Sequence, residues 1–198
     1  MDTDRFENLT RRLADRRGSR RMVLRLAGVL ALPGLHALDS RAVSAAEVAD
    51  AQCPPPTTVY GYGSHRFAQT FKAQHSGRLT RLTVNVMAMG STKFEIRNTT
   101  RKGNPGKTVL ASAEVSQIDR APVALTTPLT IEFVPGARVK KGERYALVIT
   151  GVGGTSPSMQ ANSDPGCAGT LFDDDDLDNR FSKETNNDIV FATFMTQA

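Results

Sequence analysis

The chain has 198 residues and a formal net charge of +5, from 25 Lys and Arg against 20 Asp and Glu. Nine of the basic and five of the acidic residues lie within residues 1–45, so the remaining chain carries 16 basic and 15 acidic residues, a net charge of +1. A nearly neutral domain lacks the basic surface that binds phosphate backbones, and we expect no nucleic-acid partner. The length suits one domain with an appendage.

Ser19, Arg20, Arg21, Leu24 and Arg25 follow the pattern S-R-R-x-F-L-K, with Val23 at the Phe position and Arg25 at the Lys position. With this motif, residues 1–45 resemble a twin-arginine signal peptide that forms a cleavable helix. The apolar stretch over residues 22–38 is too short for a membrane span, and small residues suit cleavage after Ala45 or Ala46. The alternative is a basic amphipathic helix that lies on a membrane or on DNA. The order of motif, apolar stretch and cleavage site favours the signal.

The signal implies where the protein works and which proteins handle it. We expect an exported protein that is extracellular, at the cell surface or periplasmic, with the twin-arginine translocase and signal peptidase as partners and no stable membrane span after cleavage. This translocase carries folded proteins, so the domain must fold before export. Cys53 is not a lipid anchor, because the three residues before it, Asp50-Ala51-Gln52, are not those of a lipobox.

Cys53 and Cys167 are the only cysteines in the chain. Two cysteines in an exported domain favour a disulfide, because that compartment permits oxidation. Two buried or free thiols are the alternative, since the sequence does not give their geometry. The sequence lacks the C-x-x-C pattern of a redox site and the ligand spacing of a zinc site.

After a Pro-rich linker and lead-in segment over residues 46–63, alternating apolar residues indicate short strands separated by turns. The expected strands include 66–72, 78–89, 93–98, 108–115, 129–133, 145–149 and 188–196, with turns at 76–77, 104–106 and 140–142. In the first of these, period two places Phe67, Gln69 and Phe71 on one face. Seven to nine such strands predict an all-β domain over residues 64–198: an antiparallel, jelly-roll-like β-sandwich.

The order of these strands and turns resembles the β-sandwich accessory domains of bacterial surface proteins, of the choice-of-anchor and carbohydrate-binding-module-like kind. The matching segments include Phe67-Ala68-Gln69-Thr70-Phe71, Asn104-Pro105-Gly106 and the run from Val139 to Val148. The resemblance covers residues 64–196 and rests on core and turn residues. It therefore supports the fold far better than it supports a function, and it transfers no catalytic residue.

An acidic run is the sharpest local feature of the sequence. Its carboxylates could bind Ca²⁺, which prefers oxygen ligands, through Asp173, Asp174, Asp175, Asp176 and Asp178. The run does not fit an EF-hand: counting from Asp173 places Leu177 at a ligand position and Asp178 where glycine is required. A calcium site at the edge of the sandwich and a solvated acidic loop both remain open.

Tyr60, Tyr62 and His65 form a second candidate site, a small aromatic platform for a sugar ring. The alternative is a lead-in loop whose tyrosines cover the core. The sequence has no G-x-S-x-G nucleophile motif and nominates no carboxylate pair. We therefore expect a non-catalytic module that binds a glycan or another surface component. A structural or protein-interaction domain of the cell surface is the alternative, and a small secreted hydrolase is a further one.

Overall fold

The structure is a computed structural model that describes residues 46–55, 60–88, 90–116, 128–163, 167–185 and 187–197. The twin-arginine motif and the apolar stretch after it lie outside the described residues. The described residues of Val43–Ala198, which form one compact unit, are all-β: fourteen strands in antiparallel sheets and no helix. The predicted antiparallel β-sandwich is confirmed.

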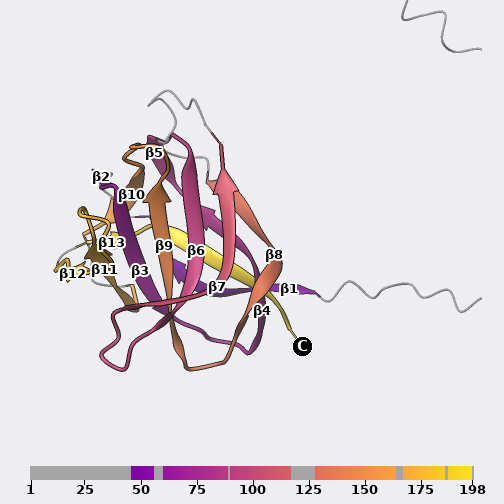
Figure 1. Ribbon diagram of the computed structural model, residues 1–198. Helices are drawn as coiled ribbons and strands as arrows, with labels where there is room; N and C mark the ends of the chain where they lie inside the picture. The colour runs from indigo at the N-terminus through magenta and orange to yellow at the C-terminus, as the bar shows by residue number, and fades with distance from the viewer. Residues whose placement is uncertain are drawn as a thin grey trace, which may run out of the picture. The chain divides into compact units, whose positions relative to one another are not determined.

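Two larger sheets form the layers of the sandwich. One has four strands in the order β1 (Glu47–Cys53), β14 (Phe191–Gln197), β4 (Gly77–Val84) and β8 (Leu129–Val139). The other has six strands in the order β12 (Ser182–Lys183), β11 (Gly169–Asp173), β3 (Arg66–Lys72), β9 (Arg144–Gly151), β6 (Thr92–Thr99) and β7 (Pro105–Val115). In Figure 1, β3, β9, β6 and β7 stand side by side in front, and the yellow β14 crosses behind them.

A third, small sheet extends one side of the sandwich. It has the order β13 (Asp188–Ile189), β10 (Ser158–Asn162) and β2 (Tyr60–Gly63), and β5 (Val86–Ala88) also pairs with β10. The predicted strand over residues 188–196 therefore divides between two sheets. Ile189 pairs with Ala161 of β10, whereas Phe191 pairs with Val84 of β4.

The core lies between the two larger sheets and follows the alternation of the sequence. Successive side chains of a strand point to opposite faces, so every second residue enters the core. The largest fully buried side chains are Phe67, Phe71, Phe94, Phe133, Leu79, Leu82, Ile96, Leu147, Ile149, Met159, Leu171 and Ile189. Gln69 is also buried, on the face that the sequence predicted, and it is fully hydrogen-bonded: its Nε2 donates to Asp188 at 2.7 Å, and its Oε1 accepts the backbone N–H of Ile189 at 3.0 Å.

The predicted disulfide is confirmed: Cys53 is bonded to Cys167, and their Cα atoms are 5.1 Å apart. Cys53 ends β1 in the four-stranded sheet, and Cys167 lies just before β11 in the six-stranded sheet. Both residues are buried. The bond therefore joins the two layers directly.

A small second cluster lies on the outer face of the six-stranded sheet. It consists of Ala68, Ala146, Val148 and Phe172, with Phe181 packed against it. Because Phe181 follows the acidic run, this contact holds the acidic segment against the sheet. The segment from Asp174 to Phe181 is called the acidic loop below.

Candidate functional site

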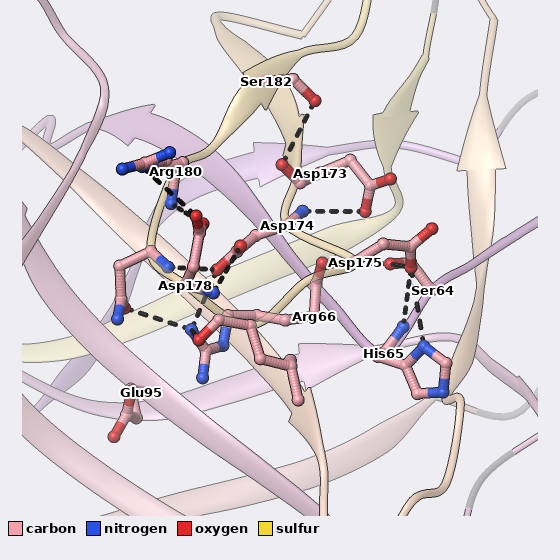
Figure 2. Close-up of polar contacts among 12 residues, drawn as sticks. Ser64, His65, Arg66, Glu95, Asp173, Asp174, Asp175, Asp178, Arg180 and Ser182 are labelled. Atoms are coloured by element: carbon pink, nitrogen blue, oxygen red, sulfur yellow. Dashed lines mark hydrogen bonds and ion pairs between the residues drawn. The ribbon is translucent and has the colours of Figure 1, made fainter.

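The fold brings together the two segments that the sequence nominated separately. Antiparallel pairing of β11 with β3 places Asp173 opposite Phe67, and the backbone N–H of Asp174 donates to the carbonyl of Arg66 at 3.0 Å. The acidic loop therefore begins beside Ser64 and His65, although these segments are more than 100 positions apart in the sequence. Figure 2 shows the resulting polar site.

Asp175 is the acidic residue that faces Ser64 and His65. Its Oδ1 lies 2.5 Å from the Ser64 hydroxyl, 3.4 Å from the backbone nitrogen of His65 and 3.7 Å from the His65 Nδ1. The hydrogen bond from Ser64, followed by that from the His65 backbone, holds the pKa of Asp175 below its usual value. The side chains of His65 and Asp175 are 49% and 64% exposed, so both are open to a ligand.

Ser64, His65 and Asp175 are the three residue types of a nucleophilic triad, but their arrangement differs from one. In a triad the imidazole lies between the hydroxyl and the carboxylate, so that it can take the hydroxyl proton. Here the Ser64 hydroxyl reaches the carboxylate directly and has the Arg66 carbonyl, at 3.1 Å, as its other acceptor. Figure 2 shows Ser64 and His65 both turned toward Asp175. The geometry suits a fixed polar surface rather than an activated serine.

Asp174 has a different role, because it is buried and fully engaged. Its Oδ2 accepts from the Arg66 guanidinium at 2.9 Å and from the backbone N–H of Asn179 at 3.0 Å, and its Oδ1 accepts the N–H of Asp178 at 3.2 Å. The exposed fraction of its side chain is 1%. Asp174 therefore fixes the turn of the acidic loop, in which Leu177 and Asn179 have positive φ angles of 58° and 63°.

Asp173 and Asp178 make local contacts, and Asp176 is exposed. Asp173 Oδ1 accepts the N–H of Asp174 at 3.0 Å, and Asp178 accepts from the backbone and the side chain of Arg180 at 2.8 and 3.3 Å. In Figure 2, Asp178 lies well away from Asp175. Within the part of the chain that the structure describes, no group of three or more His, Cys, Asp or Glu side chains could hold a metal ion. The contacts of Asp173, Asp174 and Asp178 are those of a loop that holds its own turn. Calcium binding by the acidic run stays a prediction.

Tyr62 packs partly against the core. Its ring is partly buried and meets the Phe67 ring edge-on, with centroids 5.7 Å apart. Burial, followed by the negative charges of Asp173, Glu184 and Asp175, raises the pKa of its hydroxyl well above the usual value. Tyr62 thus belongs to the rim of the site, with its ring against the core. The Tyr60 side chain lies outside the described part of the chain.

Three charged residues that the sequence did not nominate, Arg66, Arg97 and Glu95, hold the acidic loop against β3 and β6. Arg66 also donates to the Leu177 carbonyl and to Asn179 Oδ1, at 3.3 and 3.1 Å. Arg97 of β6 reaches the same Asn179 oxygen at 3.3 Å and is bonded to Glu95. Burial opposes ionisation of Glu95, but hydrogen bonds from Lys93 and Arg97 outweigh it and lower its pKa. In the sequence, Glu95 and Arg97 alternate with the apolar Phe94 and Ile96, as residues of a solvent-facing side of a strand would, so nothing distinguished them.

Comparisons with known proteins assign the chain to no family. No family model and no curated protein matches the chain. A solved structure of the clostridial cysteine protease Cwp84 has 11% sequence identity and a TM-score of 0.49, over 70% of this chain and 38% of that one. A structure of the cysteine protease and lectin-like domains of Cwp84, described as a surface-layer-associated protein of Clostridium difficile, has 10% identity and a TM-score of 0.47, over 73% and 37%.

This chain thus spans less than two fifths of the length of both Cwp84 structures. At this level of similarity they do not indicate its ligand or its activity. Among the described residues, no helix is long and apolar enough to cross a membrane.

Proposed function

We propose that this chain is an exported, non-catalytic binding module, and that His65, Asp175 and the rim residue Tyr62 form its ligand face. The observation that carries the proposal is the fixed, exposed pairing of Asp175 with the Ser64–His65 segment. A carboxylate and an imidazole that are already held in place lose little conformational entropy on binding. The twin-arginine motif supports export, and the resemblance to surface accessory domains supports the binding role.

We propose a glycan as the ligand. Sugar hydroxyls both donate and accept hydrogen bonds. Asp175 supplies acceptors, and His65 supplies one donor and one acceptor when it is neutral. The Tyr62 ring adds an apolar edge at the rim. The binding role is non-catalytic because Ser64 lacks the imidazole contact that would take up its proton.

Binding is tested on a glycan array and by pull-down with isolated cell walls. We expect Asp175→Asn and His65→Ala each to reduce glycan binding about tenfold, because hydrogen bonds to charged groups contribute roughly 1.5–3 kcal/mol. The matched control is Asp176→Asn, which removes the same charge from the adjacent exposed residue and should bind like the wild type. Absence of binding to every glycan and to cell walls, or equal losses in Asp175→Asn and Asp176→Asn, would refute this ligand face.

Export is tested separately from binding. Replacing both Arg20 and Arg21 with Lys should retain the protein in the cytoplasm, because the paired arginines define the motif. Cell fractionation with an antibody against the β-sandwich gives the distribution. A variant that is exported as well as the wild type would show that another signal directs it.

A further inference from the structure

The end of the domain opposite the acidic loop contains a basic pocket. Strand β3 runs from Arg66, beside that loop, to Lys72, which pairs with Arg144 at the start of β9. The β3–β4 loop and the β8–β9 turn therefore lie at the far end of these strands. A pocket of about 490 Å³ opens there, and the residues that line it include Arg78, Arg138, Lys140, Ser76 and Thr196.

Two arginines of this pocket are direct neighbours across the sheet. Arg78 of β4 lies between two register partners: Arg138 of β8 on one side and Thr196 of β14 on the other. Like charges directly opposite each other destabilise a sheet, so this pair needs a compensating partner. Arg78 donates to the Gly136 carbonyl at 3.0 Å. The Arg138 side chain is exposed and has no hydrogen bond or ion pair with another described residue.

Glu47 and Glu143 have partners other than this pair of arginines. Glu47, which is opposite Thr196 in the next strand, is bonded instead to Arg81 and Thr80. The hydrogen bond from Arg81 lowers the pKa of Glu47, although burial opposes this shift. Glu143 lies 3.7 Å from the Lys140 Nζ, but both side chains are more than half exposed. An exposed pair of this kind contributes little.

The turn that carries Lys140 is held rigidly. The backbone N–H of Lys140 donates to the Tyr145 hydroxyl at 2.9 Å, and that of Lys141 donates to the Ser76 hydroxyl at 2.9 Å. Gly142 donates to the Ala73 carbonyl at 2.8 Å and has a φ of 83°, which glycine adopts readily. The backbone at Lys140 is therefore fixed before any ligand arrives.

We propose that this pocket binds an anionic group, phosphate or carboxylate, carried by a sugar-sized ligand. The planar donors of Arg78 and Arg138 match the paired oxygens of both groups, and Lys140 adds a third positive charge. The pocket volume lies within the range of small-molecule sites. The site shares no residue with the Tyr62–His65–Asp175 face, so it stands independently of the glycan proposal.

Calorimetric titration of the full-length chain tests the proposal with three probes that share one ring: glucose 6-phosphate, glucuronate and glucose. We expect at least one of the two anions to bind and glucose not to bind at this pocket; which anion binds identifies the group. Arg138→Gln and Lys140→Gln should each weaken that binding about tenfold. Arg180→Gln is the matched control, because Arg180 is 88% exposed and follows the acidic run at the other end, and it should leave anion binding unchanged.

Stability without ligand gives a second readout, which separates a binding arginine from a structural one. At low salt Arg138→Gln should raise Tm, because it removes the repulsion with Arg78. The proposal is overturned if neither anion binds, if glucose binds equally, if Arg180→Gln weakens binding as much, or if Arg138→Gln lowers Tm. Tighter binding of an oligothymidylate through the same residues would also overturn it, because the ligand would then be a nucleic acid.

Discussion

The Cys53–Cys167 bond should dominate the stability of the domain. Replacing both cysteines with alanine opens a loop whose ends are 114 positions apart. The chain-entropy relation assigns about 5 kcal/mol to a loop of that length, and losses measured on removing native disulfides span roughly 2–5 kcal/mol. The bond also joins the two sheets at a buried position, so its loss leaves a small void in the core. We therefore expect the double variant to lose about 3–5 kcal/mol of unfolding free energy.

Urea denaturation followed by circular dichroism measures this loss. The wild type in reducing buffer should lose a similar amount, whereas the double variant should not respond to the reductant. For a domain of this size the loss corresponds to a fall in Tm of roughly 6–20 °C. A double variant within about 1 kcal/mol of the wild type would refute the reasoning, since it would mean that the strand pairing alone holds β1 in place.

Three further predictions concern the acidic side chains. Burial raises the folded-state pKa of Asp188, although the hydrogen bond from Gln69 opposes the shift. The ionised carboxylate therefore reduces stability above its ordinary pKa, and Asp188→Asn should raise the unfolding free energy at pH 7. Urea denaturation at pH 7 and pH 3 measures this gain, which should vanish near pH 3. Asp174→Ala leaves the Arg66 guanidinium without its carboxylate and should cost roughly 3 kcal/mol, against less than about 0.5 for exposed Asp176→Ala. Adding calcium or EDTA should leave Tm unchanged, and a rise with calcium alone would contradict the assignment of the acidic residues to loop contacts.

Most strands of the larger sheets were predictable because their side chains alternate. β1 was not: residues 46–63 were expected to form a linker and lead-in segment, but Glu47–Cys53 pairs with β14 as an edge strand of the four-stranded sheet. The range 66–72 predicted for β3 matches the observed strand, and Gln69 lies on the predicted face. Why a glutamine lies between Phe67 and Phe71 was not predictable. Its partners, Asp188 and Ile189, are about 120 positions away. Alternation determines the face of a residue, but only the pairing of strands determines its hydrogen-bond partners.

The strands between Ser158 and Lys183 were not predicted. β12 has only two residues, too few to show a period, and β10 is buried at four consecutive positions, so its residues do not alternate. The partners of the acidic run were not predictable either. Five carboxylates close together in sequence left a calcium site and a solvated loop both open, and the structure adds that Asp174 contacts Arg66 and Asp175 contacts Ser64. Spacing in the sequence does not show where the oxygens point.

The basic pocket shows why net charge is a poor guide to a local site. Residues 46–198 carry a net charge of +1, which led us to expect no phosphate-binding surface. The seven residues of β3 span roughly 20 Å, at about 3.3 Å per residue, and separate the acidic loop from the basic end. This distance exceeds two Debye lengths of about 8 Å at physiological salt. The acidic residues therefore screen the Arg78–Arg138 pair very little, and a ligand at the basic end experiences a positive field although the charges of the whole domain nearly cancel.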